Sequence, residues 1–371
     1  MRLGTLLGAA ALLASACLNT ALADDILIAS GNPMTGDSAQ FGQYKVKGIQ
    51  LAIDQANAAG GIDGRQVRLV VEDDQGNPKD AATVAQRIVS DDNIMAVIGH
   101  WNSSATLAAL PIYDKAGIPV VIDAINRKIS GASRWSFRVS VTDLREAEQL
   151  AAYIVDKLGH KKIAVLYSNN DYGQGLVTAF SDALAKSGIE LVGQEAYLDG
   201  ATDFTPQISN LQLAEPEILF IAGYYREGAL IMQQAQRLGF DVPVVGADGF
   251  TTPELIKFGG TAVEGVIFPG FYFPDAELFP GSLEFVDAYK AKFGEDPETY
   301  AALAYDVTTM ILDGMREKGV SREAIRDHLE TLEGFAGVTG NHKFDGNHDT
   351  EVTIILLTVK DGQIQLAEKQ L

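Results

Sequence analysis

The stretch MAVIGHWNSS, residues 95–104, decides the fold. Its first half, Met95–Gly99, is apolar throughout and predicts a short buried strand. The residues from Ser104 to Ala116 predict a helix that begins soon after the strand ends. Strands that are apolar on both faces and alternate with helices are typical of parallel sheets covered by helices on either side. The stretch therefore predicts an α/β fold.

The same alternation extends along the chain in two runs. The expected strands are residues 26–29, 67–71, 95–99 and 119–122 in the first run, and 162–167, 190–192, 218–222 and 243–246 in the second. The expected helices are residues 46–56, 79–90, 104–116, 144–158, a segment after Gly173, 206–211 and 228–238. Two such runs predict two doubly wound domains, which agrees with a chain too long for one core.

A third block of the chain has helices without a full set of strands. The expected helices are residues 284–293, 301–318 and 322–332, and a hairpin-like stretch follows from 344 to 362. Because helices alone cannot form another α/β domain, we expect this block to complete the first domain. The chain would then cross between the domains more than once.

The N-terminus has the parts of a secretory signal. Arg2 precedes an apolar run from Leu3 to Cys17, and an Ala-Leu-Ala sequence ends at Ala23. This pattern predicts export and cleavage after Ala23. An alternative is a lipoprotein signal with Cys17 as the lipidated residue. Cys17 is the only cysteine, so a chain cleaved after Ala23 has no thiol for disulfides, zinc or nucleophilic catalysis.

Charge and motifs exclude several classes of function. A formal net charge of −20 argues against nucleic acid and anionic membranes as partners. The sequence has no complete dinucleotide fingerprint, no phosphate-binding loop, no nucleophile elbow and no H-E-x-x-H zinc motif. Residues 345–349 imitate a calcium loop, but Thr350 stands where the loop needs glycine, so we expect a β-turn. We therefore expect no enzyme activity, no cofactor and no metal.

Candidate ligand-binding residues follow the strands, where open α/β sheets bind ligands. Ser103 or Ser104 at a helix N-terminus offers a hydroxyl and backbone N–H groups to an anion. The alternative is that one of these serines only caps the helix. Asn126 adds an amide after the next strand.

The second run of strands contributes an acid and an aromatic residue. Tyr224 follows the strand at 218–222, and Asp248 follows the strand at 243–246. Asp248 pairs in principle with an ammonium group, although an aspartate before Gly249 is commonly a turn residue. Donors from one domain and an acid from the other are what a zwitterion requires when a cleft closes on it.

Several short motifs, in this order, resemble the periplasmic branched-chain amino-acid binding proteins, the leucine/isoleucine/valine class of type I solute-binding proteins of ABC importers. The resemblance covers essentially the whole mature chain. The motifs are Pro33–Gly36, Ala58–Gly64, Asp73–Asp74 before Asn77–Pro78, Val97–His100, Asp171–Gly175, Asp203–Phe204, Gly223–Tyr225 and Glu264–Gly265.

The resemblance implies two Rossmann-like lobes joined by a three-segment hinge. After a signal peptide at 1–23, the lobe 1 residues would be 24–142 and 270–350, and the lobe 2 residues 143–269 and 351–371. The implied function is capture of a small amino acid or related acid or amide for a membrane permease of an ABC importer, by a periplasmic monomer. The alternative is a periplasmic sensor that presents its closed form to a membrane receptor.

The resemblance also implies roles for particular residues. Ser103 and the backbone around Trp101 and Asn102 would bind the ligand carboxylate, and Asp248 would bind its ammonium group. The remaining implied ligand contacts are Ala124, Asn126, Tyr224, Phe41 and Tyr172.

The sequence departs from the family pattern near this site. The loop at 122–126 reads Ile-Asp-Ala-Ile-Asn, so an amide replaces a hydroxyl and Asp123 adds an acid. Asp248 is shorter than the more common glutamate. Trp101 is bulky where smaller residues are frequent, and it narrows the pocket if it points inward. These departures leave leucine-like, small polar, aromatic-acid and amide ligands open.

Overall fold

The computed structural model describes residues 25–275 and 277–368. The predicted signal segment 1–23 and the alternative lipidation site Cys17 lie outside the described residues. No helix within 25–275 and 277–368 has the length and apolar character to cross a membrane.

The first sheet is parallel and has five strands in the described part of the chain, in the order β2-β1-β3-β4-β5. The strands are β1 Ile26–Asn32, β2 Val67–Asp73, β3 Ile94–Gly99, β4 Val120–Ile122 and β5 Ser136–Arg138. Helices α2 Pro78–Val89 and α3 Ser103–Ala116 cover one face, and α1 Ala39–Ala58 covers the other. Alternate residues of β3 face opposite helix layers, as a strand period of two requires: Val97 packs with α2 and α3, whereas Ala96 and Ile98 pack with α1.

The second sheet has the order β14-β13-β10-β9-β8-β6-β7 among the described residues. Five strands run parallel, namely β6 Ile163–Ser168, β7 Gly193–Tyr197, β8 Ile218–Ala222, β9 Val244–Gly246 and β10 Ile267–Gly270. The antiparallel hairpin of β13 Ile355–Lys360 and β14 Gln363–Glu368 extends the sheet beyond β10. The helices of this half are α4 Asp143–Ala152, α5 Asp171–Lys186, α6 Thr205–Leu213, α7 Tyr225–Arg237 and α8 Glu254–Gly259. A π-helical turn, Tyr153–Lys157, continues α4.

The third block packs on the first sheet. Its helices are α9 Ser282–Phe293, α10 Thr299–Lys318 and α11 Arg322–Glu330. Helix α10 lies against α1 and β3, and Asp306 on α10 accepts hydrogen bonds from the backbone N–H groups of Val338 and Thr339 at 2.8 Å each. These two residues join the short hairpin of β11 Phe335–Gly337 and β12 Gly340–His342. Asp306 thereby ties the hairpin to the helix.

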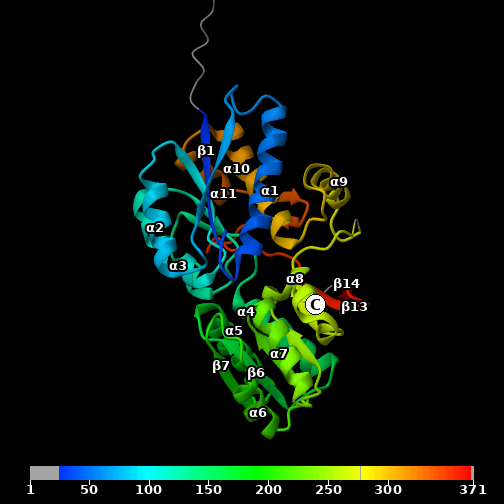
Figure 1. Cartoon of the computed structure of the whole chain (residues 1–371). Coiled ribbons are helices and arrows are strands. Elements are labelled where there is room, and N and C mark those ends of the chain that lie inside the picture. The colour runs from blue at the N-terminus through cyan, green and yellow to red at the C-terminus, as the bar shows by residue number, and fades with distance from the viewer. Residues whose placement is uncertain (1–24, 276, 369–371) are drawn as a thin grey trace, which may run out of the picture.

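We call the first sheet with its helices and this third block lobe 1, and the second sheet with its helices lobe 2 (Figure 1). Within the described residues the chain passes between the lobes three times: after β5, after β10 and before β13. The residue limits expected for the two lobes, 24–142 with 270–350 and 143–269 with 351–371, stay a prediction.

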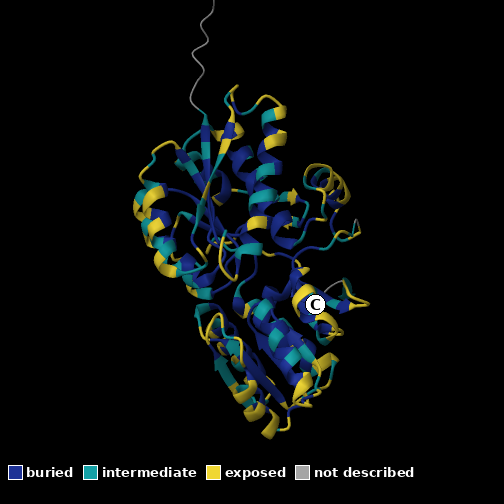
Figure 2. Cartoon of the chain, viewed as in Figure 1, coloured by how far each residue is buried: buried dark blue, intermediate teal, exposed yellow. Residues whose placement is uncertain are grey.

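Buried residues fill the interior of each lobe and continue across the junction between them (Figure 2). One apolar cluster includes Phe41 and Trp101 of lobe 1 together with Tyr172 and Tyr224 of lobe 2. The lobes are therefore in close apolar contact in this structure.

Several strands differ from the sequence prediction, among them β5, β7 and β10. The strand expected at 190–192 is wrong, because the edge strand β7 begins at Gly193 and its polar residues conceal the alternation. Strand β5 was not predicted, since it is short and contains Arg138. Strand β10 was not predicted either, because Pro269 within it normally argues against a strand.

Candidate ligand-binding site

The loop between β3 and α3 presents Trp101, Asn102 and Ser103, which are all buried. Helix α3 begins at Ser103, and no side chain caps its N-terminus. The Oγ of Ser103 has no hydrogen-bond partner within residues 25–275 and 277–368, and the Oγ of Ser104 instead donates to Asp171 of lobe 2 at 2.9 Å. The alternative that one of these serines only caps the helix is therefore wrong.

A small cavity lies between the lobes, at the carboxyl ends of their strands. Its volume is about 10 Å³, which is room for about one water molecule. The residues that line it are Trp101, Ser103, Asp123, Ala124 and Ile125 from lobe 1, and Tyr172, Tyr224 and Asp248 from lobe 2. Ser103 and Asp248, which were predicted from separate runs of the sequence, thus share one hollow.

Three of the predicted site residues do not line this cavity. Phe41 lies behind Trp101, and their ring centroids are 3.9 Å apart. Asn102 donates from Nδ2 to Ser38 Oγ at 3.3 Å and to Tyr224 Oη at 3.5 Å. Asn126 donates from Nδ2 to the backbone oxygen of Asp171 at 2.5 Å. Direct contact of these three residues with a ligand stays a prediction.

Asp248 presents a buried carboxylate to the cavity. Its Oδ1 accepts a hydrogen bond from Tyr172 Oη at 2.5 Å, and its Oδ2 accepts one from Tyr300 Oη at 3.1 Å. Burial raises the pKa of Asp248 to about 6, although both tyrosine hydrogen bonds act in the opposite direction. No basic side chain of the described residues forms an ion pair with this carboxylate. The arrangement suits a cation supplied by a ligand.

The turn that carries Asp248 depends on a glycine. A Cβ on Gly249 would lie 2.8 Å from the backbone oxygen of Gly223 and 2.9 Å from the Tyr224 ring. Only glycine permits this approach, so the turn lies directly against the strand end that carries Tyr224. Asp248 is therefore a turn residue, as its position before Gly249 predicted. Its side chain also faces the cavity.

A second buried acid supports this turn from behind. Glu146 on α4 accepts a hydrogen bond from the backbone N–H of Asp248 through Oε1 at 3.1 Å, and its Oε2 has no partner in the described part of the chain. Burial, followed by the charge of Asp248, raises the pKa of Glu146 well above its usual value. The sequence pattern offered no signal for this residue, which lies inside a helix 102 positions away from Asp248.

A buried ion pair borders the cavity in lobe 1. Lys45 Nζ lies 2.7 Å from Asp123 Oδ1, and each side chain is 2% exposed. Burial raises the pKa of Asp123, whereas the charge of Lys45 lowers it. Asp123 was noted from the sequence as an added acid in its loop, whereas Lys45, which lies one helical turn after Phe41 on α1, was not predicted.

Hydrogen bonds join the lobes on both sides of the cavity. On one side, Asp171 at the start of α5 is bonded to Ser104 and Asn126, and Lys128 Nζ lies 3.2 Å from its Oδ1. On the other side, Asp37 forms an ion pair with Arg226, and the Oη of Tyr44 donates to Glu254 Oε2 at 3.3 Å. The structure therefore has a closed cleft.

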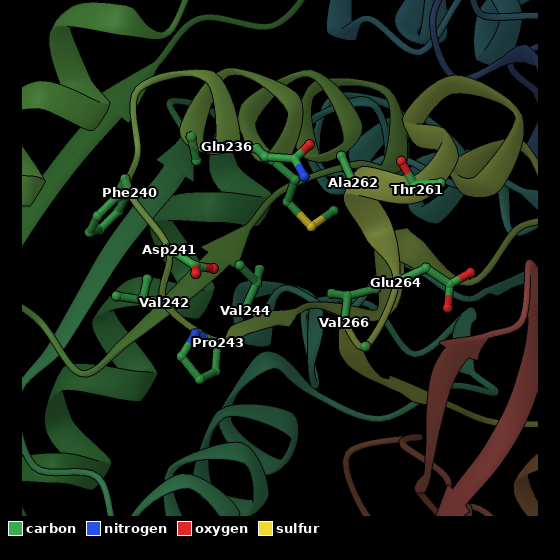
Figure 3. Close-up of a pocket in the computed structure, with 13 residues that line it drawn as sticks. Gln236, Phe240, Asp241, Val242, Pro243, Val244, Thr261, Ala262, Glu264 and Val266 are labelled. Carbon is green, nitrogen blue, oxygen red and sulfur yellow. The ribbon is translucent and has the colours of Figure 1, made fainter.

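A wider cavity lies elsewhere in lobe 2, beside the residues that precede β9 and β10 (Figure 3). It brings together none of the predicted site residues. Its acids are Asp241 and Glu264, and Glu264 already accepts hydrogen bonds from the backbone N–H groups of Asp361 and Gly362. The interlobe cavity is the candidate site.

Two α/β lobes joined by three chain passages and closed over a small cavity that Ser103 and Asp248 line define a two-lobed solute-binding protein. A family model described as periplasmic binding protein matches residues 25–363. The chain belongs to this periplasmic binding protein family, whose members bind solutes and are not enzymes. The resemblance and the absence of enzyme activity predicted from the sequence are thereby confirmed.

Curated relatives and solved structures agree with this assignment. The chain is 32% identical over 352 residues to the leucine-, isoleucine-, valine-, threonine-, and alanine-binding protein of Pseudomonas aeruginosa. The aligned region covers 94% of this chain and 93% of the relative. The chain is also 32% identical to a leucine binding protein of Thermotoga maritima, with a TM-score of 0.87 over 92% of this chain and 97% of that one. A branched-chain amino acid transporter substrate binding protein of Streptococcus pneumoniae, in complex with isoleucine, has the same TM-score at 31% identity over 93% of this chain and 99% of that one. The predicted type I fold is confirmed.

Proposed function

We propose that this protein captures a small amino acid outside the cytoplasmic membrane, as a monomer, and delivers it to the permease of an ABC importer. One observation carries the proposal: Ser103 presents a hydroxyl and Asp248 a carboxylate to one closed cavity from opposite lobes, and among the described residues the first has no hydrogen-bond partner and the second no cation. The relatives, named as amino-acid binding proteins, support the same ligand class.

The two ends of a zwitterion would meet different lobes. The ligand carboxylate would accept hydrogen bonds from Ser103 and from the free N–H groups in the first turn of α3, where the helix dipole favours an anion. The ammonium group would pair with Asp248 of lobe 2. A ligand that bridges the lobes binds the closed form more tightly than the open form and thereby shifts the equilibrium towards closure.

A thermal-shift screen tests the ligand class. Common amino acids, their amides and small aromatic acids are added separately at high concentration, and the melting temperature is measured. An amino acid present at about 100 times its Kd should stabilise the protein by about 2.7 kcal/mol, which raises the melting temperature by several degrees. The bound compound should be recovered chemically unchanged. If no amino acid in the panel shifts the melting temperature, the proposed ligand class is wrong.

Delivery to a permease is tested in cells. Deletion of the gene should abolish uptake of the ligand identified in the screen, and a plasmid copy should restore it. Unchanged uptake together with a lost transcriptional or behavioural response to the ligand would favour the sensor alternative instead.

Ser103→Ala should weaken amino-acid binding by about 1 kcal/mol, roughly fivefold, because the neighbouring N–H groups still bind the carboxylate. Titration calorimetry measures the change. Ser209→Ala is the matched control, since Ser209 is exposed on α6 and its Oγ donates only within its own helix. A Ser103→Ala variant that binds as tightly as wild type would place the ligand carboxylate elsewhere.

A further inference from the structure

Trp101 is the bulkiest residue that lines the interlobe cavity. Its indole lines the cavity together with Ser103, two residues further along the same loop. A ligand whose carboxylate meets Ser103 therefore lies within reach of the indole ring. The sequence alone does not decide whether this residue points inward, and in the structure it lines the cavity.

Neighbouring rings hold the indole in this position. It stacks on Phe41 with ring planes 16° apart, and it meets the edge of Tyr300 at a centroid distance of 5.5 Å. Tyr224 lies against it at 5.2 Å and also stacks on Tyr172 at 4.8 Å. Trp101 is only 6% exposed, so the ring cannot turn aside without losing contacts that its neighbours provide.

The remaining space is small. The cavity volume of about 10 Å³ is room for about one water molecule in the closed structure. A ligand with an amino group, a carboxylate and a side chain therefore enters only if the lobes move apart and widen the cavity. Glycine, alanine and serine need the least widening beside the indole, whereas leucine adds three carbon atoms to alanine. Pockets for larger ligands commonly measure about 300–1,000 Å³.

We propose that Trp101 is a specificity-determining residue that restricts this protein to amino acids with very small side chains, such as glycine, alanine and serine. The proposal rests on the proposed function, because it assumes an amino acid in this cavity. Asp248 and Ser103 select the zwitterion, and the indole excludes larger aliphatic side chains.

Titration calorimetry with glycine, L-alanine, L-serine and L-leucine tests this selectivity on the full mature protein. An apolar pocket distinguishes one methylene group by about 10- to 200-fold. At least one of the small amino acids should therefore bind wild-type protein at least about 100-fold more tightly than leucine. Trp101→Leu should raise the ratio of leucine affinity to alanine affinity by at least about tenfold, because it removes the bulk that excludes leucine.

Trp135→Leu is the matched control. It makes the same substitution at the other tryptophan of the chain, which packs on Arg326 at 4.5 Å and does not line the cavity. Its affinity ratio should equal that of wild type. Trp101→Phe keeps an aromatic ring and should shift the ratio of leucine affinity to alanine affinity less than Trp101→Leu does. It replaces Trp101→Leu in the test if that variant folds poorly.

Each outcome discriminates between the two proposals. Wild-type protein that binds leucine as tightly as alanine, or a Trp101→Leu variant with an unchanged ratio, overturns the role of Trp101 and leaves amino-acid capture intact. Failure of wild-type protein to bind any amino acid overturns the proposed function itself, and the selectivity proposal with it.

Discussion

Asp248→Asn is expected to weaken amino-acid binding by at least about 2–3 kcal/mol, or about 30- to 150-fold in Kd. The wild-type carboxylate has hydrogen bonds from two tyrosines but no cationic partner among the described residues. The asparagine retains a side chain of the same shape yet leaves the buried ammonium group without a counter-charge. Titration calorimetry with the tightest-binding amino acid of the screen measures the loss.

The pH dependence of binding tests whether the ionised carboxylate of Asp248 is the charge that binds the ligand. Because the pKa of Asp248 is raised to about 6 by burial, its carboxylate is ionised above that pH and protonated below it. The ligand ammonium group stays charged throughout this range. Wild-type affinity should therefore be constant near pH 8 and fall as the pH drops through about 6, whereas the affinity of Asp248→Asn should change little.

Asp241→Asn is the matched control for this prediction. It makes the same substitution on an exposed aspartate at the other cavity of lobe 2. This variant should bind as tightly as wild type and keep the wild-type pH profile. Loss of binding in Asp241→Asn, with unchanged binding in Asp248→Asn, would move the ligand site to the cavity of Figure 3.

The parts of the fold that sequence predicts well are those with local signals. The strand at 95–99 is apolar at every position, and the structure has β3 at Ile94–Gly99. Strand β7 at Gly193–Tyr197 was displaced in the prediction, because its polar edge residues break the apolar pattern used to find strands. Strand β10 was missed because its pairing with β13 tolerates a proline that local rules exclude.

The site residues that were predicted also differ from those that were missed in whether a local sequence signal marks them. Ser103 and Asp248 were predicted because each follows a recognisable strand, and carboxyl ends of parallel strands form ligand sites. Lys45, Glu146 and Tyr300 were missed because each lies inside a helix and meets its partner only through tertiary packing. Lys45 is 78 residues from Asp123, and Tyr300 is 52 residues from Asp248. No short pattern encodes contacts at such separations.

Lys45→Met is expected to lower the free energy of unfolding by about 3–5 kcal/mol at neutral pH. The substitution keeps the length of the side chain but removes its charge and leaves Asp123 buried without a cation. Burial already raises the pKa of Asp123 while Lys45 opposes that rise, so loss of Lys45 raises the pKa further. The destabilisation should therefore shrink as the pH falls and Asp123 becomes protonated. Urea unfolding at several pH values measures both effects.

Lys47→Met is the matched control, two residues away on the same helix. Lys47 is also paired, with Glu295, but these side chains are 31% and 40% exposed, so its loss should cost less than about 1 kcal/mol. The double variant Lys45→Met/Asp123→Leu should recover most of the stability lost in Lys45→Met, because it removes the buried charge that the single substitution leaves unpaired. Equal effects of Lys45→Met and Lys47→Met would show that the pair beside the cavity is hydrated in solution. Full recovery of stability in the double variant, together with weakened amino-acid binding, would instead show that the pair is retained to shape the ligand site.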